Sequence, residues 1–382
     1  MTAPAASDTR FASLDGLRGV AAFVVLLHHV ALVTPGITMT YQGHDIAPTW
    51  SLIWWASFTP LKILTAGPEA VVVFFLLSGF VLALEPLRKP AYDWLAYYPR
   101  RIVRLYLPII ASVAFAVLLI LLVPRDPSRA SSPWVGMLAD PSLGAPSVFG
   151  EATVLFHPPL FPINGPLWSL VWEVWFSLLL PLALALVLLV RRAWWAVALV
   201  SFGLSWLGFL WDWGALLYLP MFLVGVAMAR GIEDLRALAG RISALRGAPW
   251  AWLGLVLLSL LLLVIGWIIR GRGWVDTEFA ISITPEKLLG GALLLFCCAF
   301  APGARWALTL RPIAWLGKVS FSLYLVHVPV LLAIAFAVGA TQWWLTVLLA
   351  IPASLLVAWG FSVAVEMPAH RLSRRVGALV SR

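Results

Sequence analysis

Charged residues and cysteines are both scarce in this sequence. Asp, Glu, Lys and Arg make up 11% of its 382 residues, against roughly 25% in a typical soluble domain, whereas the apolar and aromatic class makes up 62%. This composition excludes a soluble globular protein, and the mean hydropathy of +0.96 excludes a disordered chain. The two cysteines, Cys297 and Cys298, are adjacent inside an apolar run, a spacing that fits neither a disulfide framework nor a zinc site.

The sequence also lacks a long hydrophilic block. We therefore predict one membrane domain over residues 1–382 and no separate soluble domain. The formal net charge of +9 would suggest nucleic-acid binding in a soluble protein, but most of the cations lie between apolar runs, where Lys and Arg act as topology signals. We predict no nucleic-acid partner.

Ten apolar runs have about the length that a helix needs to cross a bilayer. A hydrocarbon core of about 30 Å requires about 20 helical residues. The runs cover approximately residues 17–33, 69–84, 102–123, 166–190, 193–210, 215–229, 250–269, 287–301, 313–340 and 342–365. The sequence therefore predicts an all-α integral membrane protein, a bundle of about ten transmembrane helices.

Lysine and arginine are distributed unevenly between the two sides of this predicted bundle. If the N-terminus lies in the cytoplasm, 20 of the 26 Lys and Arg residues fall on the cytoplasmic side. Because cytoplasmic loops are enriched in Lys and Arg, we expect both termini in the cytoplasm. The two longest loops, about 34–68 and 124–165, are then extracytoplasmic.

Arg18 and His29 lie on one face of the first predicted helix. They are 11 residues apart, which at 100° per residue is within about 20° of three full turns, and Asp15 lies near the same face. His28 points about 100° away from His29, so the two histidines cannot do the same job. Because ionisable residues inside a membrane are costly and commonly functional, we expect Arg18 and His29 to belong to a functional site. The alternative is a histidine that only hydrogen-bonds two helices together.

Polar side chains also form stripes on two later apolar runs. Ser169 and Glu173 are one helical turn apart, and Glu173 lies at about the same predicted depth as His29. Tyr324 and His327 share a face of the ninth run. A carboxylate and an imidazole can therefore face one cavity, whereas the alternative for Glu173 is a packing pair with a buried cation.

Three arginines, Arg100, Arg101 and Arg104, open the third run, with Tyr106 just inside it. Membrane orientation explains the positive charges but not the choice of arginine throughout, and the arginine fork suits phosphate oxygens. An anionic cytosolic ligand and a plain topology signal both remain open. Ser78, in the second run, is weaker evidence, because small residues in such helices commonly serve packing.

Six segments, in this order, resemble the motifs of the integral-membrane acyltransferase family 3. They are LDGLRG at 14–19 followed by His29, VFFLLSGF at 73–80, RRIVRLY at 100–106, LWSLVWE at 167–173, YLVH at 324–327 and EMP at 366–368. The resemblance covers a core of about residues 14–375, nearly the whole chain. Members of this family are O-acyltransferases that modify cell-surface and secreted glycans in bacteria and some antibiotic sugars, which implies a multi-pass protein of the bacterial inner membrane.

The resemblance implies a cytosolic acyl-CoA donor, usually acetyl-CoA, no metal, and a sugar hydroxyl of a glycan or glycolipid as acceptor. CoA would then rest against Arg18, Arg101, Arg104 and Tyr106, and its thioester would reach toward His29. The imidazole would act either as general base for the hydroxyl or as a transient carrier of the acyl group, and Glu173 would orient the imidazole or the sugar. We assign six further residues to substrate binding: Asp15, Ser78, Trp168, Ser169, Tyr324 and His327.

Two other classes of function compete with acyl transfer. A transporter or flippase of a sugar-linked lipid would use the same His and Glu residues to relay protons or to bind the sugar. A structural membrane subunit is the third class, but it does not account for aligned polar stripes on three runs.

Overall fold

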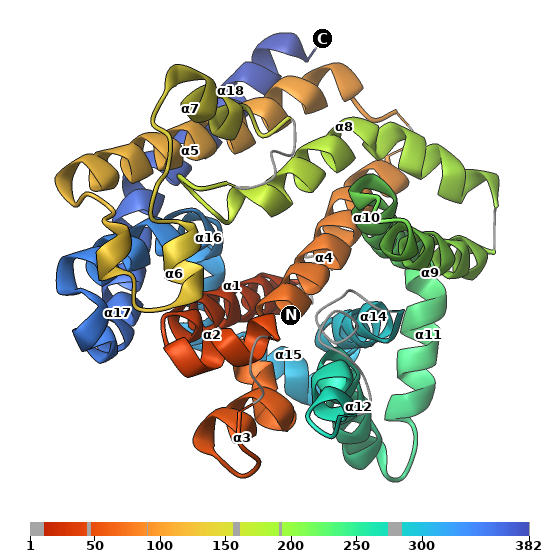
Figure 1. Cartoon of the computed structure of the whole chain (residues 1–382). Coiled ribbons are helices and arrows are strands. Elements are labelled where there is room, and N and C mark those ends of the chain that lie inside the picture. The colour runs from red at the N-terminus through yellow and green to blue at the C-terminus, as the bar shows by residue number, and fades with distance from the viewer. Residues whose placement is uncertain are drawn as a thin grey trace.

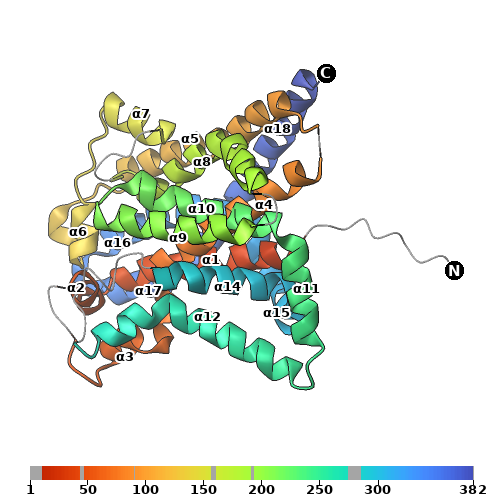
Figure 2. The same ribbon diagram turned by 90° about the vertical axis from the view of Figure 1, so that its right-hand side faces the viewer.

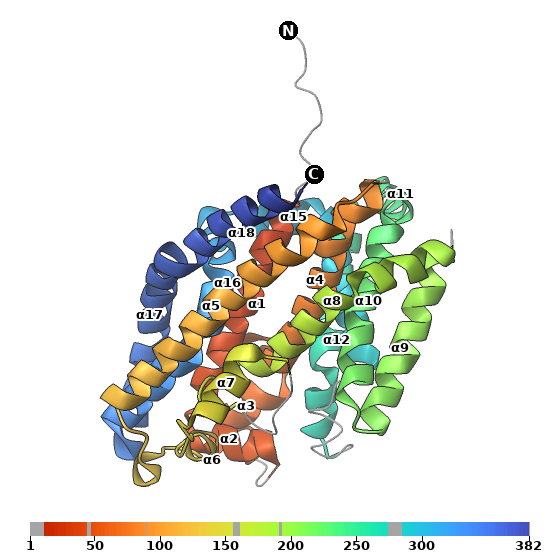
Figure 3. The same ribbon diagram turned by 90° about the horizontal axis from the view of Figure 1, so that it is seen from above.

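The structure is a computed structural model, and it describes residues 11–43, 47–89, 91–155, 161–190, 193–273 and 285–381. Within these ranges the regular elements are helices, and no strand occurs. Long helices run side by side and form one bundle (Figures 1 and 3). The prediction of an all-α membrane protein is therefore confirmed.

Among the described residues, seven helical segments are long and apolar enough to cross a membrane. They are α1 (Ala12–Leu32), α4 (Gly67–Arg88), α5 (Trp94–Leu122), α8 (Leu167–Leu189), α12 (Ala248–Arg270), α16 (Arg311–Val338) and the stretch Ala340–Val380, which contains η3 (Ala340–Gln342), α17 (Trp343–Phe361), the π-helical η4 (Ser362–Glu366) and α18 (Met367–Val380).

Three further apolar runs form helices of a different kind. α10 (Gly214–Arg230) meets α11 (Ile232–Ser243) at a bend of 71°, and α14 (Pro285–Phe300) meets α15 (Pro302–Leu308) at 85°. α9 (Trp194–Leu210) has 17 residues, which is short for a span. The count is therefore seven, or nine if each bent pair is one span, so the count of ten and the orientation of the termini stay predictions. Arg10, Arg191, Arg192 and Arg382, which contribute to the orientation argument, lie outside the described residues.

Short helices cover one end of the bundle. α2 (Pro35–Gln42), α3 (Leu52–Phe58) and η1 (Pro60–Thr65) follow α1, while η2 (Pro127–Arg129), α6 (Pro133–Met137) and α7 (Ala145–Thr153) lie between α5 and α8. Figures 2 and 3 show α2, α3, α6 and α7 at one end, and α11, α15 and the last part of α18 at the other. The segments predicted as extracytoplasmic loops thus contain ordered helices that gather at one end.

Glycine lets α1 and α16 approach closely enough for their backbones to touch. A Cβ atom on Gly19 would lie 2.4 Å from the backbone nitrogen of Gly317, and one on Gly317 would lie 2.5 Å from the carbonyl oxygen of Asp15. No side chain fits at such distances, so these positions require glycine. The close contact sets the register in which His29 of α1 meets His327 of α16.

Candidate active site

A cavity of about 670 Å³ extends from the first turn of α1 to the middle of α16, between α1, α4, α5, α8, α16 and the segment from η4 to α18. Eight of the predicted site residues line it: Asp15, Arg18, Ser78, Arg101, Arg104, Ser169, Glu173 and Tyr324. These side chains come from five helices that are far apart in the sequence. The structure thus brings the arginines and the carboxylates of the prediction into one place.

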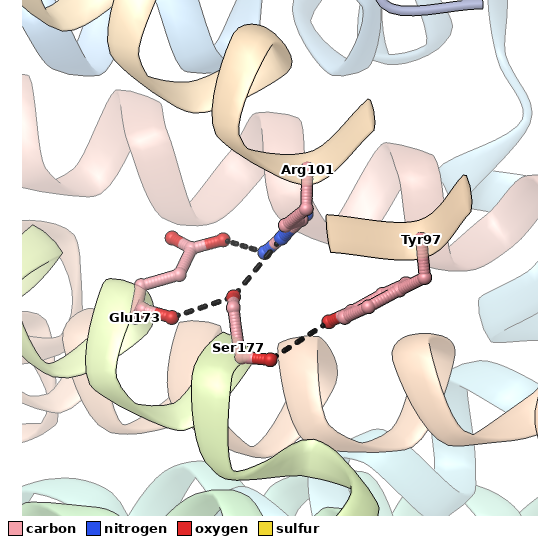
Figure 4. Close-up of polar contacts among 4 residues, drawn as sticks. All are labelled: Tyr97, Arg101, Glu173 and Ser177. Atoms are coloured by element: carbon pink, nitrogen blue, oxygen red, sulfur yellow. Dashed lines mark hydrogen bonds and ion pairs between the residues drawn. The ribbon is translucent and has the colours of Figure 1, made fainter. Parts of the chain in front are cut away.

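Among the residues that line the cavity, Arg101 and Glu173 form an ion pair (Figure 4). The Arg101 Nη2 atom donates to Glu173 Oε1 at 2.7 Å and its Nε donates to Ser177 Oγ at 3.0 Å. Ser177 Oγ in turn donates to the Glu173 carbonyl at 2.7 Å, and Tyr97 donates to the Ser177 carbonyl at 3.1 Å. The side chains of Arg101 and Glu173 are only 11% and 24% exposed. Glu173 therefore pairs with Arg101 in this structure, and a direct role in orienting His29 stays a prediction that its contacts do not support.

The remaining cations of the cavity differ in how they are paired. Arg18 lies 3.7 Å from Asp15. Arg104 and Lys318 also line the cavity, and neither forms a hydrogen bond or ion pair with any residue that the structure describes. Two basic side chains are therefore available to an anionic ligand without the loss of an existing ion pair.

His29 and His327 form a hydrogen-bonded pair from α1 and α16. Nδ1 of His29 lies 3.0 Å from Nε2 of His327. Each ring also contacts a backbone carbonyl of its own helix. Nδ1 of His327 lies 2.9 Å from the Leu323 carbonyl oxygen, and Nδ1 of His29 lies 3.0 Å from the Val25 carbonyl oxygen. The pair joins residues that are 298 positions apart in the sequence.

The carbonyl partners decide where the protons of the neutral pair lie. A carbonyl oxygen only accepts, so Nδ1 of His327 carries a hydrogen and its Nε2 has a lone pair. That lone pair accepts from Nδ1 of His29, which must then carry the hydrogen. Nε2 of His29 is therefore left as an acceptor, the state that a general base or a nucleophile requires.

His28 has different partners from His29. Its Nδ1 lies 2.9 Å from the Thr65 carbonyl oxygen, and its ring is 94% buried against Tyr41 and against Gly67, whose Cβ would lie 2.5 Å from the imidazole. The different partners agree with the expectation from helix geometry that the two histidines have different roles.

Tyr324 separates the cavity from the histidine pair. Of the described residues that line the cavity, none is His29 or His327. The Tyr324 hydroxyl is hydrogen-bonded to Ser169 Oγ at 2.5 Å, and its ring centroid lies 5.9 Å from that of His327. The predicted residues therefore form two groups: those that line the cavity, and the histidine pair next to Tyr324.

Comparisons with known proteins show the family to which the chain belongs. Residues 11–363 match the model of the acyltransferase-3 family, which describes an acyltransferase domain. The chain belongs to the acyltransferase-3 family. It is 28% identical to "Acyltransferase MdmB" of Streptomyces mycarofaciens, in an alignment that covers 96% of this chain and 93% of that protein. No solved structure matches the chain.

Membership of the acyltransferase-3 family identifies the protein as an enzyme that transfers acyl groups, and its apolar helices identify it as a multi-pass membrane protein. Within the described ranges, no three His, Cys, Asp or Glu side chains come together as metal ligands would.

Two predicted site residues lie apart from the cavity of this acyltransferase. Trp168 packs its ring 5.4 Å from that of Tyr218 and is partly buried. Tyr106 is partly buried on α5 and, like Trp168, is not among the described residues that line the cavity. Their roles in binding CoA and substrate stay predictions without a contact to support them.

Three ionisable cavity residues were not assigned to the site from the sequence: Lys318, Glu366, which opens the EMP segment, and His370. Glu366 accepts from Ser322 Oγ at 2.5 Å and lies 3.8 Å from His370 Nε2. All three are ionisable residues within or beside apolar runs, so the rule that led to Glu173 would have found them. Glu366 also ends the π-helical turn, and such turns are frequent at functional sites.

Proposed function

We propose that this acyltransferase transfers an acyl group, most simply acetyl, from acyl-CoA to a hydroxyl group of a sugar in a glycan or glycolipid. The observation that carries the proposal is the hydrogen-bond chain from Leu323 through His327 to His29, which leaves Nε2 of His29 as an acceptor. An imidazole in that state has the protonation that acyl transfer to a hydroxyl requires.

The cavity is the proposed site of the acyl-CoA donor. Its volume of about 670 Å³ lies within the range of roughly 300–1,000 Å³ that is typical of small-molecule pockets. Arg104 and Lys318 would meet the phosphates first, since neither side chain is committed to a partner among the described residues. Arg18 and Arg101 would join them by exchanging Asp15 and Glu173 for phosphate oxygens.

The chemistry follows from the lone pair on Nε2 of His29. On one route Nε2 takes the proton of the sugar hydroxyl while the sugar oxygen attacks the thioester carbonyl; the C–S bond breaks, and the leaving CoA thiolate takes the proton from the imidazolium. On the other route Nε2 attacks the carbonyl itself, the C–S bond breaks and CoA leaves as the thiolate. The sugar oxygen then attacks the acyl-imidazolium, the C–N bond breaks, Nε2 regains its lone pair, and the hydroxyl proton goes to the CoA thiolate. Both routes require the thioester to pass Tyr324, because neither histidine is among the described residues that line the cavity.

A purified sample in detergent or nanodiscs, given acetyl-CoA and a panel of methyl hexosides and methyl 6-deoxyhexosides, tests the proposal. We expect CoA release that depends on the sugar, a mass increase of one acetyl group on the sugar, and loss of both in His29→Ala. If the protein releases no CoA but moves a fluorescent glycolipid between the leaflets of a vesicle, the transporter is the correct function.

The location follows the same reasoning. We propose a multi-pass protein of the bacterial inner membrane with both termini in the cytoplasm, so that the cavity near the start of α1 meets cytosolic acyl-CoA. The acceptor would then reach His29 from the end of the bundle that carries α2 and α6 (Figure 3).

A further inference from the structure

Trp134 of α6 lies against the catalytic candidate His29 on the side that the donor cavity does not reach. The two ring centroids are 5.3 Å apart and the planes are inclined by 36°. Trp134 and His29 are both only partly buried, whereas His327, the partner of His29 on α16, is fully buried. His29 is therefore partly exposed although it does not line the donor cavity.

The position of Trp134 is fixed by hydrogen bonds from its own segment to the end of α1. Ser132 Oγ donates to the Leu32 carbonyl at 2.7 Å, and Ser131 Oγ donates to the Val33 carbonyl at 3.0 Å. Ser132 Oγ also caps α6 by accepting from the amide of Val135 at 3.3 Å. Because these carbonyls lie three and four residues beyond His29 on the same chain segment, the indole is held in place relative to the imidazole before any ligand arrives.

Tyr41 of α2 provides a second aromatic ring near the histidines. Its ring lies 5.1 Å from that of His28, which in turn lies 5.2 Å from that of His29. Gln42, the next residue on α2, donates from Nε2 to Met137 Sδ of α6 at 3.5 Å, so α2 and α6 are adjacent. The Tyr41 ring is already stacked on Trp267 at 5.3 Å, with the Lys62 ammonium 5.3 Å from its centroid, so Trp134 is the ring that remains for a ligand beside His29.

The indole of Trp134 has an unused polar group. Its Nε1–H makes no hydrogen bond to any residue that the structure describes. A partly exposed indole combines a flat apolar face with a hydrogen-bond donor at its edge. A sugar ring offers the complement: a face of C–H groups and an edge of hydroxyl oxygens.

We propose that Trp134 forms part of the binding site of the acyl acceptor, and that the acceptor is a sugar ring. The indole face packs against the sugar, Nε1–H donates to one hydroxyl, and the neighbouring hydroxyl is held at Nε2 of His29. This inference rests on the proposed function. It makes Trp134 the residue that determines which acceptor is used, while the cavity determines the donor.

Replacement of Trp134 separates acceptor binding from donor binding. In Trp134→Ala, we expect the KM for the methyl glycoside to rise at least tenfold while the KM for acetyl-CoA changes less than twofold. Hydrolysis of acetyl-CoA without sugar should increase, because water reaches His29 where the ring stood. Trp134→Phe keeps a ring without the N–H and should give an intermediate KM. Trp55→Ala is the matched control, because Trp55 is 41% exposed on α3 and packs against Trp50 and Trp54 instead.

An unchanged acceptor KM in Trp134→Ala, or equal rises in both KM values, would overturn the inference. CoA binding measured by calorimetry on each purified variant shows whether it is folded. If Trp134→Ala does not bind CoA, Trp134→Phe decides by the same comparison.

A second readout does not need turnover. Diethyl pyrocarbonate modifies accessible histidines, and peptide mass mapping reports the modification of His29. The methyl glycoside should protect His29 in the wild type and protect it less in Trp134→Ala. If the wild type binds CoA and acetylates the sugar but the sugar gives no protection, only the acceptor site is wrong. If the wild type neither binds CoA nor releases it, the proposed function itself is wrong.

Discussion

At the scale of single residues, one hydrogen-bond chain determines what each imidazole nitrogen can do. The Leu323 carbonyl fixes the hydrogen on Nδ1 of His327, and the Val25 carbonyl and Nε2 of His327 both require a hydrogen on Nδ1 of His29. His29 is thereby held in one tautomer and one orientation without a carboxylate. His327 is a positioning residue in this scheme, because it acts on the reaction through His29.

Substitution of the two adjacent histidines should have unequal effects. In His29→Ala we expect acetyl transfer to fall by roughly 10²- to 10⁴-fold, the usual contribution of a general acid–base group, with membrane insertion unchanged. In His28→Ala the rate should fall less than tenfold, because His28 bonds to the Thr65 carbonyl and packs against Gly67. The rate of CoA release by equal amounts of purified protein measures both. An equal loss in both variants would contradict the assignment of the active imidazole to His29.

Variants of His327 test the positioning role. In His327→Ala the Val25 carbonyl still fixes the tautomer of His29, but the imidazole loses the partner that orients it from α16, so we expect a fall of about tenfold in kcat. The KM for acetyl-CoA should stay the same, since His327 is not among the described residues that line the cavity. His327→Gln restores an acceptor for Nδ1–H of His29 and should recover part of the loss. A raised KM with unchanged kcat would instead indicate that His327 binds substrate.

At the scale of elements, helix periodicity predicts faces but not partners. The 3.6-residue period separates His28 from His29, as their different partners do, and it puts Arg18 and His29 on one face; in the structure Arg18 and Glu173 line the cavity and His29 does not. The period did not predict that His29 pairs with His327 and Glu173 with Arg101, since those contacts depend on how distant helices pack. Helix periodicity also does not predict the glycine contact that sets the register of α1 against α16.

Segment 124–165 shows a second limit of the sequence argument. It has no apolar period, so the sequence predicts only a loop. In the structure, the Arg125 guanidinium donates to the carbonyls of Leu138, Pro162 and Ile163, and the Glu151 carboxylate accepts from the amides of Ile163 and Asn164. Buried charges that satisfy backbone groups hold the segment together, and such contacts have no signature in local sequence. Trp134 was missed as a site residue for this reason.

The Glu151 carboxyl should make the stability of this segment depend on pH. Burial raises the pKa of Glu151 from its ordinary 4.5 to about 7, because the loss of hydration outweighs the two amide donors and the nearby Arg125. A carboxyl whose pKa is higher in the folded state favours folding when protonated, so its stabilisation is full below pH 4.5 and is lost as the pH rises to about 7. The loss is about 3 kcal/mol at most.

Thermal unfolding of the purified protein between pH 5 and pH 8 measures this effect. The wild type should lose stability relative to Glu151→Gln as the pH rises, because the amide does not ionise. Asp140→Asn, which changes an exposed carboxylate of the same segment, is the control and should follow the wild type. A stability difference between wild type and Glu151→Gln that does not vary with pH would show that Glu151 is already ionised at pH 5.

At the scale of the whole molecule, the donor cavity and the proposed acceptor site lie toward opposite ends of the bundle. The cavity begins at the first turn of α1, near α15 and α18, and Trp134 lies at the end that carries α2 and α6 (Figures 2 and 3). Such a layout suits a reaction in which the acyl group comes from one side of the membrane and the acceptor from the other. Its direction depends on the distribution of Lys and Arg, which predicts α11 and α15 on the cytoplasmic side.

Cysteine labelling tests this orientation directly. Gly240 of α11 and Gly150 of α7 lie at opposite ends of the bundle, and a Cβ atom on either would have no neighbour within 4 Å, so a cysteine is tolerated at both positions. The native Cys297 and Cys298 are buried and give little background. In spheroplasts, a maleimide that does not cross membranes should label Gly150→Cys at once and Gly240→Cys only after permeabilisation. The reverse pattern would place the donor cavity on the outer side, where acyl-CoA is absent, and would require a different acyl donor for the same histidine pair.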